Sequence, residues 1–207
     1  MEQETTEDIE KMAGMVPSDK PYSRTGIVEM WKNRVPWLLF LMISATFTSV
    51  ILTHFEDMLA VQAALVAFIP MLMGTGGNSG AQASTAVIRS LSLGDTEPKD
   101  VLSVIWKELR VALLCGLTLC CVNFVKMLLL DRLVLGNDEV TVSIAATVSL
   151  SILFIVMFAK SVGSMLPIAA EKIGVDPAVM ANPLISTLTD AVSLLIYIYI
   201  AKLILHI

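Results

Sequence analysis

The sequence predicts an all-α integral membrane protein, with five transmembrane helices per subunit preceded by a short amphipathic helix. Of its 207 residues, 56% are hydrophobic and only 16% are charged. A soluble domain of this size needs more charge to cover its surface. Several apolar stretches are long enough to cross a bilayer. Because lipid offers the backbone no hydrogen-bond partner, these stretches are expected to be helices.

The chain is expected to divide into two parts. Residues 1–34 are interpreted as a cytoplasmic tail and an amphipathic helix, and residues 35–207 as the transmembrane domain. Five of the first ten residues are acidic and the first apolar run starts only at Trp37, a pattern unlike that of a cleavable signal peptide. Within residues 22–34, large apolar residues are interleaved with basic ones, which is typical of a helix lying at the membrane surface.

The apolar stretches place five spans at roughly 36–54, 58–90, 106–130, 140–172 and 178–206. The second and fourth are too long for a straight crossing of about 30 Å, so we expect them to tilt, kink or protrude. Lys and Arg residues concentrate before the first span and after the second, whereas the first loop has none. By the positive-inside rule, this places the N-terminus in the cytoplasm and the C-terminus outside the plasma (inner) membrane.

The last span carries an acidic residue, Asp190, near its middle, where an ionised carboxylate costs at least about 2.5 kcal/mol. At about 100° per residue, it shares one face of the helix with other polar residues. This polar stripe consists of Asn182, Ser186, Thr189, Asp190, Ser193 and Tyr197. A hydrogen-bonded seam between helices could explain the Ser and Thr residues alone. The carboxylate favours the wall of an aqueous pore, with Thr189 and Ser193 among the residues that line it.

The second span carries the glycine-rich stretch PMLMGTGGNSGAQAST at residues 70–85. Proline and four closely spaced glycines predict a broken helix at membrane depth, where freed carbonyls can face a water-filled cavity. We therefore interpret Gly76, Gly77, Asn78 and Gln82 as pore-lining. The alternative is a small-residue packing site, since Gly76 and Gly80 also form a GxxxG pattern.

Other polar or reactive residues exclude several functions. The sequence has no basic patch of the kind that would predict a nucleic-acid partner. Cys115, Cys120 and Cys121 lie within one apolar span and are interpreted as packing residues. Neither of the two histidines has a metal-ligand neighbour at helical spacing, so no zinc or haem site is expected. Lys160 in the fourth span could neutralise a site or extend its charge toward the cytoplasm, and both interpretations stay open.

The oxygen ligands of the polar stripe predict which ion would pass. Carboxylate, amide, hydroxyl and carbonyl oxygens, without thiolate or imidazole, suit Mg²⁺, Ca²⁺ or Mn²⁺. Mg²⁺ sheds its water reluctantly, so one carboxylate per chain would hold it as a hydrated ion. At about 4 Å and an effective dielectric constant near 20, each carboxylate attracts a divalent ion by roughly 8 kcal/mol. Two carboxylates from two-fold-related subunits would discriminate against monovalent ions.

Several longer motifs resemble those of the MgtE family of magnesium transporters. They are NRVPWL at 33–38, GNSGAQAS at 77–84, DPA at 176–178 and NPLISTLTDAVSLLIY at 182–197. The resemblance implies a homodimer of five-helix subunits embedded in membrane lipid, with the pore between the second and fifth helices. It assigns the ion-selective carboxylate to Asp190, joined by the Ser186 carbonyl and the Asn182 amide. Ala81 and Ser193 depart from the family's usual residues.

The resemblance also implies a regulatory difference. Family members usually carry an N-terminal domain and CBS domains that sense cytosolic Mg²⁺, whereas about twenty residues precede the plug-like helix here. We therefore expect weaker closure by internal Mg²⁺.

Together, these observations predict a passive, potential-driven Mg²⁺ channel, with Mg²⁺ as the transported ion and no enzymatic activity. A proton- or sodium-coupled divalent-cation transporter is the alternative. An intramembrane aspartyl hydrolase would need a pair of carboxylates sharing a proton, and each chain has one acid at the middle of its spans.

Overall fold

The computed structural model describes residues 2–18, 20–180 and 182–206, without the side chains of residues 2–5, 180 and 182. Across this part of the chain every regular element is helical, which confirms the predicted all-α fold. The α-helices are α1 (Glu2–Met12), α2 (Ile27–His54), α3 (Glu56–Val61), α4 (Ile69–Ser92), α5 (Val101–Lys126), α6 (Val142–Lys172) and α7 (Asn182–Leu205). A π-helical segment, Met127–Val134, continues α5. A 3-10 segment, Pro177–Met180, leads into α7.

Four helical stretches of the described chain are long and apolar enough to cross a membrane: Ile27–His54, Pro98–Val134, Val142–Lys172 and Pro183–Leu205. This supports a multi-pass membrane protein, but it does not confirm five spans. The remaining expected span corresponds to α4, whose 24 residues would reach about 36 Å. Its many Gly, Ser, Thr, Asn and Gln residues lower its hydropathy, so composition alone does not mark it as a span.

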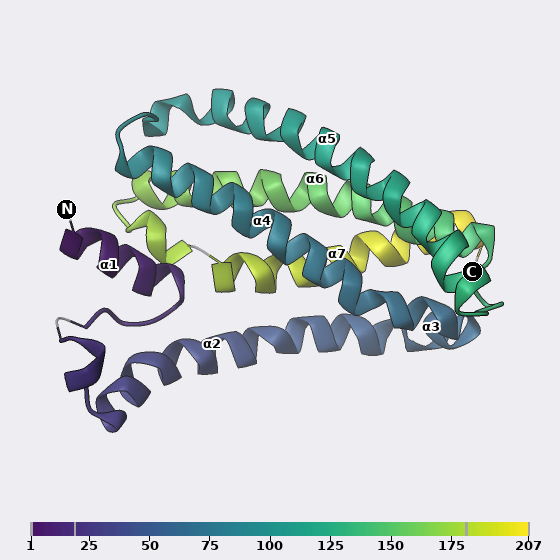
Figure 1. The fold of residues 1–207 in the computed structure, drawn as a ribbon, viewed down its shortest axis with the longest axis horizontal. Helices are drawn as coiled ribbons and strands as arrows, with labels where there is room; N and C mark the ends of the chain where they lie inside the picture. Colours follow the sequence, from purple (N-terminus) through teal and green to yellow (C-terminus); the bar gives the residue numbers. More distant parts are fainter. Residues whose placement is uncertain (1, 19, 181, 207) are drawn as a thin grey trace.

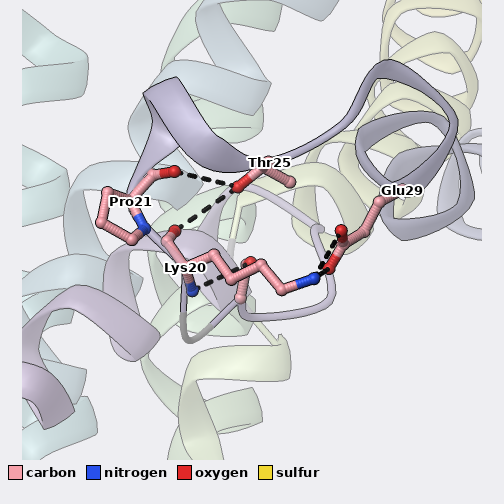
Figure 2. Close-up of polar contacts among 5 residues, drawn as sticks. Lys20, Pro21, Thr25 and Glu29 are labelled. Carbon is pink, nitrogen blue, oxygen red and sulfur yellow. Dashed lines mark hydrogen bonds and ion pairs between the residues drawn. The ribbon is translucent and has the colours of Figure 1, made fainter.

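Residues 22–34 do not form a helix of their own. A single 3-10 turn, Tyr22–Arg24, precedes α2, which then continues through Pro36 to His54. The Thr25 hydroxyl donates to the Pro21 carbonyl at 3.1 Å, and the Lys20 ammonium donates to both carboxylate oxygens of Glu29 at 2.9 and 2.8 Å (Figure 2). These contacts tie the turn to the first turn of α2. None of the residues of α2 is buried within the chain, so its apolar side chains are free to face lipid or another subunit.

The glycine-rich stretch forms one uninterrupted helix, α4, so the prediction of a break within it is wrong. The interruption lies earlier, where α3 ends at Val61 and a 3-10 segment, Ala63–Phe68, precedes α4. Pro70 stands in the first turn of α4, where its missing N–H removes no intrahelical hydrogen bond. The glycines are compatible with a helix here because the neighbouring helices use the space that their missing side chains leave.

The close contacts of α4 are made with α6 and α7. A Cβ on Gly163 of α6 would overlap the carbonyl of Gly80. A Cβ on Gly76 would lie 2.6 Å from the Ser193 hydroxyl oxygen of α7. The small-residue packing alternative is therefore confirmed for this stretch. Glycine allows two helix backbones to approach more closely than any residue with a side chain.

Figure 1 shows how these helices are arranged around α6 and α4. α5 packs against α6 on one side, and α2 lies along α7 on the other. The Tyr197 hydroxyl of α7 donates to the Leu65 carbonyl at 3.0 Å and is buried there, which anchors α7 to the segment before α4. α1 lies at the end of the molecule where α7 begins, away from the C-terminus (Figure 1).

Candidate ion site on the last helix

Asp190 is the most unusual side chain of α7, the helix on which the polar stripe was expected. It is half-buried and lies near the middle of this 24-residue helix. Within the described part of the chain, its carboxylate forms no hydrogen bond and no ion pair. Among the described residues, neither an amine nor a hydroxyl compensates for this charge. A carboxylate in this position needs water, a cation or a second subunit.

Ser186 lies one helical turn before Asp190 and is also half-buried. Its hydroxyl oxygen would lie 3.1 Å from a Cβ built on Gly77, so α4 passes close to this part of α7. The Ser186 carbonyl accepts a hydrogen bond from the Thr189 hydroxyl at 3.0 Å. Ser186 of α7 thus lies against the glycine face of α4 at Gly77. The side chain of Asn182, the third predicted ligand, lies outside the described residues.

Thr189 and Ser193, the stripe residues next to Asp190 on α7, are fully covered, unlike Asp190 itself. Both side chains have an exposed fraction of 0%, because they pack against α4 at Gly80 and Gly76. The Ser193 hydroxyl has no hydrogen-bond partner among the described residues. In a single chain these two predicted pore-lining residues face the contact between helices. The polar stripe is therefore split between a covered half and a half-exposed half that carries the carboxylate.

Asn78 and Gln82 lie on another face of α4. Both are exposed and line a groove that α4 shares with α5 and α6. In contrast, Gly76 and Gly77 face α7. The groove that the two amides line includes no residue of α7, whereas Gly76 meets Ser193 and Gly77 meets Ser186 of that helix. Helical spacing correctly placed Asn78 and Gln82 on one face but could not tell which neighbour that face meets.

One chain alone offers few ligands for a dehydrated ion. No group of three or more His, Cys, Asp and Glu side chains gathers into a metal cluster within the described residues. The arrangement around Asp190 supplies one carboxylate together with backbone and hydroxyl oxygens. Such a sparse set of oxygens suits a cation that keeps its own water, since the bound water molecules fill the coordination positions that the protein oxygens leave open.

Comparison with known proteins identifies the family. Residues 69–200, from the start of α4 almost to the end of α7, match the family model MgtE, described as a divalent cation transporter. The match covers more than half of the chain. This chain belongs to the MgtE family. The resemblance drawn from the sequence motifs is thereby confirmed, and the family is one of transporters rather than enzymes.

Individual relatives agree with this MgtE assignment. The chain is 40% identical over 206 residues to the "Magnesium transporter MgtE" of Thermus thermophilus. It is 33% identical over 203 residues to the protein of the same name from Bacillus subtilis. These matches take in 100% and 98% of this chain, but 44% and 43% of the two relatives. The MgtE chain described here thus spans less than half the length of the curated relatives it matches.

An ion pair lies just before the helix that carries Asp190. The Lys11 ammonium of α1 contacts the Asp176 carboxylate at 2.7 Å, and Asp176 also accepts a hydrogen bond from the Ala178 amide. Burial opposes the ionisation of Asp176 most strongly, but the two hydrogen bonds and the Lys11 charge outweigh it and lower its pKa. The pKa of Lys11 is raised, chiefly by the hydrogen bond to Asp176 and against the effect of burial. The pair ties α1 to the segment that enters α7.

These pKa shifts predict the pH range over which α1 stays attached. The contribution of Asp176 is complete above its unfolded pKa of about 3.9 and is lost as the pH falls through its lower folded value. That of Lys11 is complete below about 10.4 and is lost as the pH rises through its higher folded value. Amide exchange in α1, corrected for intrinsic rates, should therefore show constant protection between about pH 5 and 9.

Replacing Asp176 by asparagine should speed amide exchange in α1 and lower its local stability by about 0.5–1 kcal/mol, because the pair is partly exposed. Glu7→Gln is the matched control, because the Glu7 carboxylate lies farther from the same ammonium, at 4.0 Å. It should have the smaller effect. Equal exchange rates in wild type and Asp176→Asn would show that this ion pair does not hold α1 in place.

Proposed function

We propose that this MgtE-family chain conducts Mg²⁺ passively across the plasma (inner) membrane as a homodimer. The ion binds in hydrated form at Asp190, and the membrane potential drives it inward. The observation that carries the proposal is the half-exposed carboxylate near the middle of α7, which has no hydrogen-bond or ion-pair partner in the described part of its own chain. A membrane protein retains such a costly group where an ion or water meets it.

A second subunit completes the site in this proposal. Asp190 and Ser186 lie on the part of α7 that α4 and α6 leave partly uncovered, so a two-fold-related chain can bring its own carboxylate near. Two carboxylates double the attraction for a divalent ion, and both exert it through the ion's water shell. The Ser186 carbonyl and the Asn182 amide contribute further oxygens. Thr189 and Ser193 hold α7 against α4 in the described chain, and they line the path only where these two helices separate.

The driving force needs no second substrate. At a potential of −100 mV, a divalent cation gains about 4.6 kcal/mol on moving inward. In this proposal the N-terminus is cytoplasmic and the C-terminus external, an orientation that the distribution of Lys and Arg supports. Passive flow through a pore is therefore sufficient to accumulate Mg²⁺ against a moderate concentration ratio.

The test is Mg²⁺ entry into liposomes that contain the purified protein and a fluorescent Mg²⁺ indicator. A potassium diffusion potential, negative inside, should produce uptake that grows with the potential and is independent of pH and Na⁺ gradients. Uptake that requires an imposed proton or Na⁺ gradient would contradict a channel. It would indicate the coupled transporter, in which Asp190 binds the coupling ion. Protein-free liposomes treated identically control for leakage.

A further inference from the structure

Lys160 of α6 is a second costly group, and the ion path proposed above does not use it. Its side chain is buried, with an exposed fraction of only 5%. It donates one hydrogen bond, to the Gln82 side-chain oxygen at 3.3 Å. No carboxylate pairs with it among the described residues. A buried ammonium costs several kcal/mol unless an opposite charge or several polar groups compensate for it.

Lys160 borders a groove of about 490 Å³ between α4, α5 and α6. The polar side chains that line this groove are Thr75, Asn78, Ser79, Gln82, Thr118 and Lys160. Leu114 and Leu119 of α5 form an apolar wall. Since one water molecule occupies about 30 Å³ in the liquid, the groove has room for an ion with part of its hydration shell.

The hydrogen-bonding groups of the groove favour an anion. The Thr75 and Thr118 hydroxyls already donate to backbone carbonyls of their own helices, at 2.7 and 2.9 Å. The Gln82 side-chain oxygen accepts from Lys160, which leaves the amide N–H groups of Gln82 available. The Asn78 amide adds two further N–H donors. An ammonium and two amides therefore present positive charge and N–H groups to the same space.

The depth of the groove decides which anion can reach it. Lys160, Gln82 and Thr118 each lie near the middle of a long helix, in α6, α4 and the α5 stretch. A lipid phosphate group stays at the membrane surface, about 15 Å from the middle of the hydrocarbon layer. The occupant must then be a small ion that comes from water. The glycines that face α7 lie on another side of α4, so this groove is separate from Asp190.

We propose that the groove binds a small inorganic anion such as chloride, with the Lys160 ammonium as its charge partner and the Asn78 and Gln82 amides as hydrogen-bond donors. The anion compensates for the buried positive charge. It thereby stabilises the packing of α4 against α6 at the level of Lys160. This site is independent of the proposed function, because it involves neither Asp190 nor transported Mg²⁺.

The test compares thermal unfolding of the detergent-purified protein, followed by tryptophan fluorescence, in sodium chloride and in sodium gluconate of equal ionic strength. Gluconate is a much larger, polyhydroxylated anion, so it should bind the Lys160 ammonium more weakly than chloride. Chloride should raise the melting temperature saturably, by roughly 3 °C. Lys160→Gln should remove this difference, and Lys160→Arg should retain it. Lys172→Gln, at the exposed end of the same helix, is the matched control and should behave as wild type.

A second measurement guards against a misfolded variant. Broadening of the chloride NMR line should occur with wild type and not with Lys160→Gln. Asn78→Leu keeps the charge but removes one donor, and should weaken chloride binding about tenfold. Equal stabilisation by gluconate, or a chloride response that persists in Lys160→Gln, would overturn the proposal.

Discussion

Replacing Asp190 by alanine is expected to lower potential-driven Mg²⁺ flux at least about 100-fold, or to make the remaining flux unselective. The attraction of roughly 8 kcal/mol between the carboxylate and a divalent ion is a gross value. The alanine variant loses this attraction, but it also avoids the cost of desolvating the carboxylate, which offsets much of the loss. A net loss of about 3 kcal/mol already corresponds to a factor of about 100. The liposome assay with Mg²⁺ and Na⁺ measured separately distinguishes a blocked pore from an unselective one.

Two further variants separate charge from shape at this position. Asp190→Asn keeps the size of the side chain and removes its charge, so it should lose flux nearly as strongly as alanine. Ser186→Ala, one turn away on the same half-exposed side of α7, is the matched control. Because the proposal uses the Ser186 carbonyl rather than its hydroxyl, flux should stay within a fewfold of wild type. Selective flux that is unaffected in both Asp190 variants would make the polar stripe a packing seam and place the pore elsewhere.

Gly163→Ala is expected to destabilise the protein by at least about 3 kcal/mol, because the new methyl group would overlap the Gly80 backbone. A backbone carbonyl in a helix cannot move aside as a flexible side chain can. The two helices α4 and α6 must therefore separate, which removes contacts along their whole interface. Unfolding in mixed detergent micelles, followed by circular dichroism, gives the change in free energy.

The matched control is Gly74, a glycine of α4, the helix that Gly163 contacts. A Cβ on Gly74 of α4 would meet no atom within 4 Å, and this residue is exposed. Gly74→Ala should therefore stabilise the protein by about 0.5–1 kcal/mol, since alanine loses less backbone entropy in a helix. Similar effects of both substitutions would mean that helix propensity, and not close contact, determines the role of the glycines.

The sequence by itself determined the membrane class, the helical fold and the family motifs, and it singled out Asp190 as the candidate ion site. These conclusions rest on composition and on the cost of charge in lipid, and neither depends on how the helices meet. The lengths of the apolar stretches likewise located three expected spans, those that contain α5, α6 and α7. Most of their expected ends lie within a few residues of the ends of the observed helices.

Only the tertiary structure decided how the glycine-rich stretch behaves. Glycine has a low intrinsic preference for helix, which is why a break was predicted between Pro70 and Thr85. In the folded chain, the space above Gly76, Gly77 and Gly80 lets α6 and α7 approach α4 closely. The resulting contacts outweigh the local preference.

Tertiary structure also decided which polar residues belong together. Helical spacing identified the faces that carry Asn78 with Gln82 and Asp190 with Thr189. It could not show that the first pair meets Lys160 in a separate groove, or that Thr189 is covered while Asp190 is half-exposed. The angle between residues on a helix follows from the chain alone. The neighbour that covers each face depends on how the helices pack, because every one of these contacts joins residues far apart in sequence.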